Sequence, residues 1–320
     1  MSYAIGLDLG GTDIKYGLVD HTGTILYQSI RPTYLPAGEP GVFDNIIDAI
    51  KELEEVANTK GLRPEGIGIG VPAIIDEGLV TGCTANLPEL EGMPLGSRIA
   101  QERGLPVWVD NDANLMGLAE WKFGAARNLA DVIFLTIGTG IGGAIVVNGE
   151  LYTGHRHRGA ELGHIIVDLN GLPCGCGGKG CLEAHASVRA LIEDYKSRLS
   201  EISFPPHPPE ITSSPYPPEI TGKWIVARYL EDQPAAVRAM NHHFDYLGAG
   251  IAGLINIFAP RKLIIGGGIS EAGDFYIDAI RQRAMNRAMK QCSQYTVIEA
   301  AQLGNSAGFM GAAAFVFNSL

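Results

Sequence analysis

Four side chains between residues 164 and 181 have the composition and spacing of a metal site. His164 is followed by Cys174, Cys176 and Cys181, and glycines stand at positions 175, 177, 178 and 180. Three thiolates and one imidazole form the closed, tetrahedral ligand set of a structural zinc ion, and the glycines let the loop wrap tightly. The alternative for such a cysteine cluster is a reactive redox loop. Cys83 and Cys292 stand alone and are expected to be packing residues.

Asp112 is a candidate general base. It lies in the segment Asn111-Asp112-Ala113-Asn114, directly after a short predicted strand at 107–110. Functional groups of α/β proteins gather at the carboxyl ends of strands, and a carboxylate there can take a proton from a substrate. Asp and Asn also favour the N-cap of a helix, which is predicted to begin here. The local sequence alone favours the capping role, and the two roles are compatible.

Glu161, His164 and Glu183 bracket the predicted metal ligands. Grouped acceptors of this kind suit sugar hydroxyls, each of which needs several hydrogen-bond partners. Glu183 lies two residues after Cys181, so its alternative role is to orient the metal ligands.

Two glycine turns are candidates for phosphate binding. The first, Asp8-Leu9-Gly10-Gly11-Thr12, joins two strands, and its glycines let backbone amides approach a phosphate while Asp8 can reach Mg²⁺. It is not a Walker A loop or a dinucleotide fingerprint, because a strand follows it in place of a helix. The second turn, within 136–143, repeats the arrangement. Either turn alone could be a simple hairpin, but together with Gly266–Gly268 they indicate a nucleotide-binding cleft.

The elements that position these residues occur twice. A strand, glycine turn, strand, turn, strand unit spans 4–29 and returns from 132 to 152, about 128 residues later, which predicts two related domains. Asn148-Gly149 is a hairpin signal within the second unit. Residues 202–221 are rich in proline and predict a polyproline loop. Further strands are expected at 66–71 and 262–265, and helices at about 42–57, 94–103, 112–123, 222–230, 235–258, 272–290 and 305–317.

Composition limits the classes of protein to which the chain can belong. A length of 320 residues favours two domains, and the net charge of −11 disfavours a nucleic-acid partner. No apolar run approaches the roughly 20 residues that span a membrane. The N-terminus has no basic region typical of a signal peptide, so a cytoplasmic protein is expected.

The combined motifs resemble the ROK family of sugar kinases, above all its bacterial ATP-dependent glucokinases. The most specific part is Glu161-Leu162-Gly163-His164 followed by Cys174-x-Cys176-Gly177-x-x-Gly180-Cys181-x-Glu183, and the matching features extend from Asp8 to about Gly311. The resemblance implies an α/β protein with an actin-like ATPase (ribonuclease H-like) fold, in which a cleft separates two α/β domains. These would be residues 1–113 plus about 303–320, and residues 114–302 with the zinc site and the proline-rich loop.

The resemblance also implies residue roles. Asp112 would be the general base, and the zinc ligands would be His164, Cys174, Cys176 and Cys181. The sugar site would comprise Asn86, Asn111, Asp112, Glu161, His164 and Glu183. ATP and Mg²⁺ would lie along Asp8, Gly10, Gly11, Thr12, Lys15, Gly138, Thr139, Gly140, Gly267 and Gly268.

The chain departs from the family pattern before its Glu-x-Gly-His motif. The loop reads His155-Arg156-His157-Arg158-Gly159-Ala160, where small residues are usual and glycine is common at 160. It could alter the choice of sugar, contact a neighbouring subunit or be a solvated loop without a role, and the last is favoured. Ala144 likewise stands where the family usually has a third glycine after Gly142-Gly143.

The expected reaction is phosphoryl transfer from ATP to the 6-hydroxyl of a hexose, with glucose the first candidate. The alternatives are N-acetylmannosamine, N-acetylglucosamine, fructose or allose as acceptor, and polyphosphate as donor. A sugar-sensing regulator is the alternative from another class, although Asp8 lies too near the start for a preceding DNA-binding segment. The expected partners are sugar and ATP, without nucleic acid or membrane, in a homodimer or a dimer of dimers.

Overall fold

The computed structural model describes residues 2–34, 41–76, 78–82, 87–200 and 219–320, and every structural statement below concerns these residues. Asn86, Cys83 and the proline-rich residues 205–218 lie outside them. The chain forms two compact units. Unit 1 comprises residues 1–135, 143–161 and 301–320, and unit 2 comprises residues 136–142 and 162–300. The division into residues 1–113 plus 303–320 and residues 114–302 stays a prediction.

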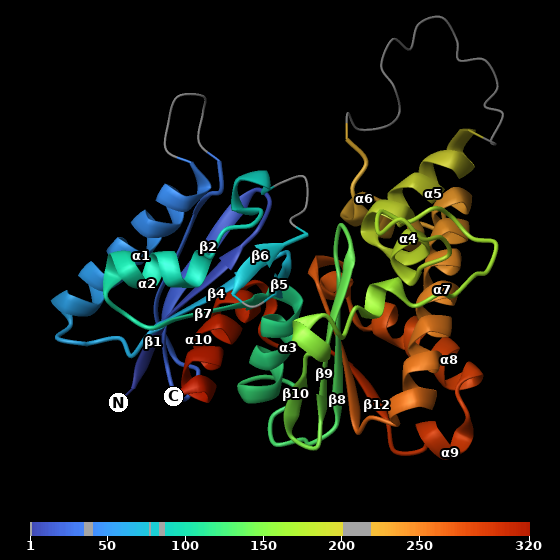
Figure 1. The fold of residues 1–320 in the computed structure, drawn as a ribbon. Helices are drawn as coiled ribbons and strands as arrows, with labels where there is room; N and C mark the ends of the chain where they lie inside the picture. Colours follow the sequence, from blue (N-terminus) through green and yellow to red (C-terminus); the bar gives the residue numbers. More distant parts are fainter. Residues whose placement is uncertain (1, 35–40, 77, 83–86, 201–218) are drawn as a thin grey trace, which may run out of the picture. The chain divides into compact units, whose positions relative to one another are not determined.

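Groups of strands are followed by helices along the chain, as in a mixed α/β protein (Figure 1). The strands are β1 (Tyr3–Leu9), β2 (Asp13–Asp20), β3 (Ile25–Pro32), β4 (Ile67–Val71), β5 (Ile74–Asp76), β6 (Leu79–Thr81), β7 (Val107–Asn111), β8 (Val132–Ile137), β9 (Ile141–Val147), β10 (Glu150–Tyr152), β11 (Lys262–Gly266) and β12 (Val297–Ala300). The α-helices are α1 (Val42–Thr59), α2 (Leu95–Arg103), α3 (Asp112–Lys122), α4 (Leu182–Ala186), α5 (Val188–Ser200), α6 (Gly222–Leu230), α7 (Pro234–Phe258), α8 (Asp274–Arg287), α9 (Lys290–Ser293) and α10 (Ala307–Ser319). None of the described helices is long and apolar enough to cross a membrane.

The first sheet has the strand order β3-β2-β1-β4-β7. β1 pairs antiparallel with β2 and parallel with β4, which pairs parallel with β7. Alternation along β1 directs Ile5, Leu7 and Leu9 into one core cluster with α1 and α2. The opposite face of the sheet is covered by α10 and α3.

Glycine allows α10 to lie directly on the first sheet. A Cβ on Gly6 would come within 1.9 Å of the Phe309 carbonyl oxygen, and one on Gly68 within 1.9 Å of the Ala312 carbonyl oxygen. No side chain fits in either place, so the helix backbone rests against the strand backbones. The C-terminal helix therefore packs beside the N-terminal strand, and both belong to unit 1 (Figure 1).

The second sheet has the order β10-β9-β8-β11-β12, which repeats the order of the first. The predicted hairpin joins β9 and β10, with Asn148 at φ 54° and Gly149 at φ 74°. Both values are positive, as a type I′ turn requires, and this explains the Asn-Gly pair. In unit 2, α7 packs against α8, α5 and α6. Phe244 of α7 and Tyr276 of α8 are among the largest buried side chains of this unit.

Most of the predicted helices are confirmed to within a few residues. The helix expected at 272–290 is interrupted, because Ala288 adopts an extended conformation (φ −72°, ψ 149°) that ends α8, and α9 begins at Lys290. The helices α4 and α5 and the short strands β5, β6 and β12 were not predicted from the sequence. Strands of three or four residues carry too little alternation to be recognised.

Candidate functional site

In unit 1 the strand register aligns acidic residues at one edge of the first sheet. Asp8 on β1 lies opposite Gly70 on β4, and Gly70 lies opposite Asp110 on β7. The carboxyl ends of these parallel strands therefore meet at one edge, as expected for an α/β site. Asp112 follows at once as the first residue of α3.

Asn111 is the N-cap of α3. Its side-chain oxygen accepts hydrogen bonds from the Ala113 amide (3.0 Å) and the Asn114 amide (3.2 Å), and its Nδ2 donates to the Ala73 carbonyl oxygen (3.3 Å). Asp112 Oδ1 accepts a hydrogen bond from the Ala113 amide at 2.9 Å. Asn111, which accepts from two amides of the first turn, is therefore the main cap of the helix.

Burial makes the carboxyls of Asp8 and Asp112 basic. The pKa of Asp8 is raised from 3.8 to about 7, mainly by loss of solvation and to a smaller degree by repulsion from Asp112. Lys15, which pairs with Asp8 across β1 and β2, lowers this pKa in part. Asp112 keeps some exposed surface, but the protein encloses its carboxyl, and this desolvation raises its pKa to about 6. The exposed Glu161 also raises it. A divalent cation would offset the repulsion between two neighbouring carboxylates and favour their charged forms. Mg²⁺ prefers oxygen ligands, so the pair fits this ion.

The first glycine turn is exposed at Gly11 and Thr12. Its base is closed by a hydrogen bond from the Gly10 amide to the Asp13 carbonyl oxygen at 2.9 Å. Asp8 lies at the N-terminus of α10, because a Cβ on Gly308 would come within 2.2 Å of the Asp8 carboxylate. The turn therefore presents its exposed tip beside a helix N-terminus and the carboxylate of Asp8.

Unit 2 contains the second glycine turn and the Gly267–Gly268 segment. The Gly138 amide donates to the Gly140 carbonyl oxygen (2.9 Å), and Thr139 is exposed at the tip. Gly267 has φ 91°, and a Cβ there would lie 2.2 Å from the Ile137 carbonyl oxygen, so only glycine fits. The end of β11 thus lies directly against the end of β8 that opens the turn.

The four predicted metal ligands come together in unit 2. One ligand atom from each of His164, Cys174, Cys176 and Cys181 lies within 4.8 Å of all the others. The Cys174 Sγ–His164 Nδ1 distance is 3.6 Å, and the Cys176 Sγ–Cys181 Sγ distance is 3.7 Å. A tetrahedral zinc with Zn–S bonds of about 2.3 Å has S···S edges of about 3.8 Å. The donor set and its spacing therefore fit a zinc ion.

Glu183 connects this cluster to the second glycine turn. Its Oε2 accepts a hydrogen bond from the Ile141 amide at 2.9 Å, and its Oε1 lies 4.0 Å from Cys174 Sγ. A Cβ on Gly140 would come within 2.5 Å of the same carboxylate, so glycine is needed there. Glu183 is therefore in a position to hold the turn and the metal loop in one arrangement.

His185 is a supporting residue that sequence analysis missed. Its Nε2 accepts a hydrogen bond from the Leu172 amide (3.2 Å) in the metal loop, and its ring stacks on Tyr246 at 4.2 Å. Tyr246 in turn donates to Asp168 Oδ2 at 3.2 Å. The position of His185, four residues after Cys181 on a helix, was the available signal.

The basic loop at 155–158 is anchored by an acidic residue of β5. Arg156 Nε lies 2.8 Å from Asp76 Oδ1, and Arg158 pairs with Asp76 Oδ2. These hydrogen bonds, that of Arg158 above all, hold the pKa of Asp76 below its usual value. Ala160 adopts the left-handed conformation (φ 63°), which glycine accommodates more readily than alanine. Residues 155–158 are all exposed, and Asp76 anchors two of them, so the interpretation of a solvated loop without a role stays a prediction.

The predicted site residues divide between the two units, and each unit is described by itself. Unit 1 holds Asp8, Gly10, Gly11, Thr12, Lys15, Asn111, Asp112 and Glu161, whereas unit 2 holds Gly138, Thr139, Gly140, His164, Cys174, Cys176, Cys181, Glu183, Gly267 and Gly268.

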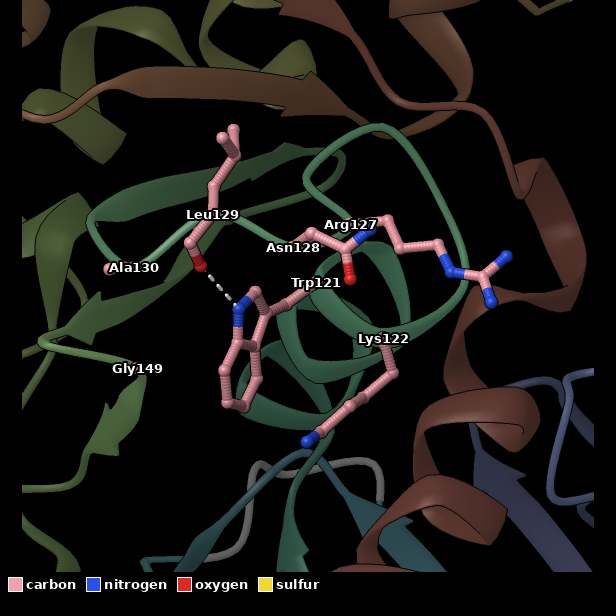
Figure 2. A pocket seen from close by; sticks show the side chains of 7 residues that line it. All are labelled: Trp121, Lys122, Arg127, Asn128, Leu129, Ala130 and Gly149. Carbon is pink, nitrogen blue, oxygen red and sulfur yellow. Dashed lines mark hydrogen bonds between the residues drawn. The ribbon is translucent and has the colours of Figure 1, made fainter.

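A separate open hollow of about 320 Å³ lies at the far end of α3, and none of the predicted site residues lines it (Figure 2). Trp121 Nε1 donates to the Leu129 carbonyl oxygen at 2.7 Å, and Lys122 Nζ lies 4.1 Å from the centre of the Trp121 ring. Burial lowers the pKa of Lys122. These contacts fix the C-terminus of α3 at the end opposite Asp112.

Comparison with known proteins shows the family. The ROK family model matches residues 4–319. The chain belongs to the ROK family. It is 36% identical to the glucokinase of Thermotoga maritima over 317 residues, covering 98% of this chain and 96% of that protein. It is also 28% identical to the xylose repressor of Bacillus subtilis, covering 99% of this chain and 77% of the repressor.

Solved ROK structures confirm the fold. The structure of a ROK family glucokinase from Streptomyces griseus, in complex with glucose and AMPPNP, matches with a TM-score of 0.81 at 35% identity, over 99% of this chain and all of that one. A ROK hexokinase from Thermus thermophilus matches with a TM-score of 0.82 at 31% identity, over 99% of this chain and 98% of that one. The predicted α/β, actin-like ATPase fold class is therefore confirmed.

Proposed function

We propose that the protein is an ATP-dependent hexose kinase that phosphorylates glucose at its 6-hydroxyl, with Asp112 as general base. The observation that carries the proposal is the carboxyl of Asp112, which lies at the end of β7 with a pKa of about 6. A general base works best when its pKa is near the operating pH, so the raised pKa makes Asp112 a better base than an ordinary aspartate. Similarity to glucokinases supports glucose, and the glucose–AMPPNP complex of the Streptomyces griseus protein supports ATP.

In the proposed reaction the Asp112 carboxylate accepts the proton of the sugar hydroxyl. The hydroxyl oxygen forms a bond to the γ-phosphorus while the bond from that phosphorus to the bridging oxygen breaks, giving glucose 6-phosphate and ADP. The exposed glycine turns at 10–12 and 138–140 would donate amide hydrogen bonds to the phosphates. Mg²⁺, held near Asp8, would supply positive charge to the phosphate oxygens.

The metal cluster is proposed to hold structural zinc. Four protein ligands leave no open coordination position, so zinc would supply rigidity to the loop at 164–181. Because Glu183 contacts both Cys174 and Ile141, this rigidity would extend to the second glycine turn. The full sets of sugar and nucleotide residues predicted from the sequence, the cytoplasmic location and the homodimer or dimer of dimers remain proposals.

Replacing Asp112 with Asn tests the mechanism. We expect kcat to fall by about 10²- to 10⁴-fold, because the amide cannot accept the proton, while the glucose Kd measured by calorimetry changes little. Asp20→Asn is the matched control, since Asp20 is also a buried carboxyl but lies at the other end of the first sheet, opposite Tyr3, and its replacement should retain most of the turnover. Near-normal turnover of Asp112→Asn would remove Asp112 as the base.

A coupled assay over a panel of acceptors and donors tests the substrate. Glucose, fructose, allose, N-acetylglucosamine and N-acetylmannosamine are compared with ATP and with polyphosphate. Highest kcat/KM for glucose with ATP supports the proposal, and a higher value for another sugar replaces glucose in it. Sugar binding without turnover of any acceptor would favour a regulator, the class to which the similar xylose repressor belongs.

A further inference from the structure

The exposed glycine turn is held from beneath by a single buried residue, Thr33. The Thr33 hydroxyl donates to the Gly10 carbonyl oxygen at 2.6 Å, and the Thr33 amide donates to the Thr12 carbonyl oxygen at 2.8 Å. Thr33 has no exposed surface, although it lies just beyond the end of β3. One residue therefore fixes both ends of the segment Gly10–Thr12, whose tip is exposed.

Thr33 is itself held by a polar side chain of α1. Asn45, which is only 3% exposed, donates from Nδ2 to the Thr33 carbonyl oxygen at 3.1 Å. An amide buried to this degree is costly unless it is hydrogen-bonded, so the contact fixes the position of Thr33 relative to α1. Apolar side chains would fill the same space without fixing this position.

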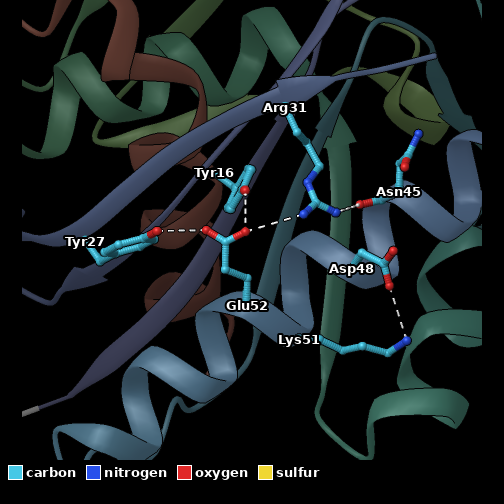
Figure 3. A network of polar contacts seen from close by, with 7 residues as sticks. All are labelled: Tyr16, Tyr27, Arg31, Asn45, Asp48, Lys51 and Glu52. Carbon is cyan, nitrogen blue, oxygen red and sulfur yellow. Dashed lines mark hydrogen bonds and ion pairs between the residues drawn. The ribbon is translucent and has the colours of Figure 1, made fainter. Parts of the chain in front are cut away.

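The hydrogen bonds continue into a network that crosses from the sheet to α1 (Figure 3). Arg31 Nη1 donates to the Asn45 carbonyl oxygen at 3.2 Å, and its Nη2 lies 3.4 Å from Glu52 Oε2. The Glu52 carboxylate also accepts from the hydroxyls of Tyr16 (2.7 Å) and Tyr27 (2.8 Å). Residues from β2, β3 and α1 thus brace Asn45, and through it the support of the turn.

We propose that Thr33, braced by Asn45, is a positioning residue that preorganises the Gly10–Thr12 turn for the phosphates of the nucleotide. With the carbonyls of Gly10 and Thr12 engaged from beneath, the exposed tip at Gly11 and Thr12 keeps one conformation before the ligand arrives. Donors that are already in place need no reorganisation on binding, and this strengthens their interaction with charge. The inference rests on the proposed function, because it assigns the turn to a nucleotide.

The test compares Thr33→Val, which removes the hydroxyl at nearly constant volume, with Thr33→Ser, which keeps it. One lost hydrogen bond corresponds to about a 3- to 10-fold change, so Thr33→Val should raise the Kd for AMPPNP and the KM for ATP by this factor. The glucose Kd should stay within about 2-fold, and Thr33→Ser should restore most of the nucleotide affinity. All variants are assayed below the onset of their thermal unfolding.

Asn45→Ala provides an independent variant if Thr33→Val does not fold. It is expected to weaken nucleotide binding in the same direction, again without changing glucose binding. An equal loss of glucose and nucleotide affinity, unchanged nucleotide affinity in both variants, or a Thr33→Ser variant as weak as Thr33→Val would overturn the inference. Failure of the unaltered protein to bind AMPPNP would instead overturn the proposed function itself, and the two failures are therefore distinguishable.

Discussion

Replacing Asp8 with Asn should stabilise the ligand-free protein at pH 8. In the folded state, burial and the neighbouring Asp112 raise the pKa of Asp8 from 3.8 to about 7. The folded protein therefore binds a proton more tightly than the unfolded chain does. The contribution of Asp8 to stability is therefore fully present below about pH 4 and is lost as the pH rises through about 7. Asparagine does not ionise, so the variant escapes this loss.

The size of the effect follows from the shift in pKa. At about 1.4 kcal/mol for each pH unit, a pKa raised from 3.8 to about 7 corresponds to an upper limit of about 4 kcal/mol at pH 8. We expect a gain of about 2 to 4 kcal/mol, because the amide does not reproduce every contact of the protonated acid. For a protein of 320 residues, the gain corresponds to an increase in Tm of about 3 to 6 °C.

The assay is thermal unfolding at pH 5 and pH 8 without Mg²⁺ or nucleotide. At pH 5 Asp8 is already protonated in the folded protein, so the difference between Asp8→Asn and the unaltered protein should be clearly smaller than at pH 8. Asp20→Asn is the matched control. Asp20 is also buried, which would raise its pKa, but hydrogen bonds from Thr22 and Thr24 lower it overall. Its replacement should therefore destabilise the protein at pH 8.

A lower Tm of Asp8→Asn at pH 8, or the same difference at both pH values, would refute the reasoning. Activity provides the complementary result, because Asp8→Asn should lose Mg²⁺-dependent turnover while gaining stability. A gain in stability with a loss of activity is expected at a buried charge that destabilises the ligand-free protein but is needed to bind a ligand.

Further outcomes follow from the same structure. The kcat/KM for glucose should fall as the pH drops through about 6, because protonated Asp112 cannot act as base, and a pH–rate profile flat down to pH 5 would contradict this. Cys176→Ser should lower both the zinc content measured by mass spectrometry and the Tm. Cys292→Ser, outside the cluster, should change neither. An unchanged metal content in Cys176→Ser would exclude Cys176 as a ligand. Glu120 is fully buried and accepts hydrogen bonds from the amides of Ala125, Gln302 and Leu303, each at 2.8 Å. Glu120→Ala should therefore lower the free energy of unfolding in urea by about 3 to 5 kcal/mol. A decrease below about 1 kcal/mol would show that water replaces the carboxylate.

Local chemistry is what the sequence predicted well. The four predicted metal ligands lie within 18 residues, and their glycine-rich spacing allows few geometries, so their clustering could be predicted before any fold was known. The same holds for the Asn148-Gly149 hairpin, whose positive φ values follow from residue type. Helix positions such as 42–57 and 235–258 followed from apolar periodicity and were confirmed.

Contacts between distant segments were decided by tertiary structure alone. Asp8 and Asp112 are 104 positions apart in the sequence, and the register of β1, β4 and β7 brings Asp112 close enough to help raise the pKa of Asp8. The pairing of Asp76 with Arg156 and Arg158 likewise depends on the fold, which brings the loop at 155–158 next to β5. Burial and pairing belong to the packed fold, and no local spacing encodes them.

Asp112 shows both contributions in one place. The sequence by itself identified Asn111-Asp112 as the junction between a strand and a helix, because residue type and periodicity fix such a boundary. Which of the two side chains caps the helix, and how basic the other becomes, depended on the orientation of each side chain and on the desolvation that the packed fold imposes.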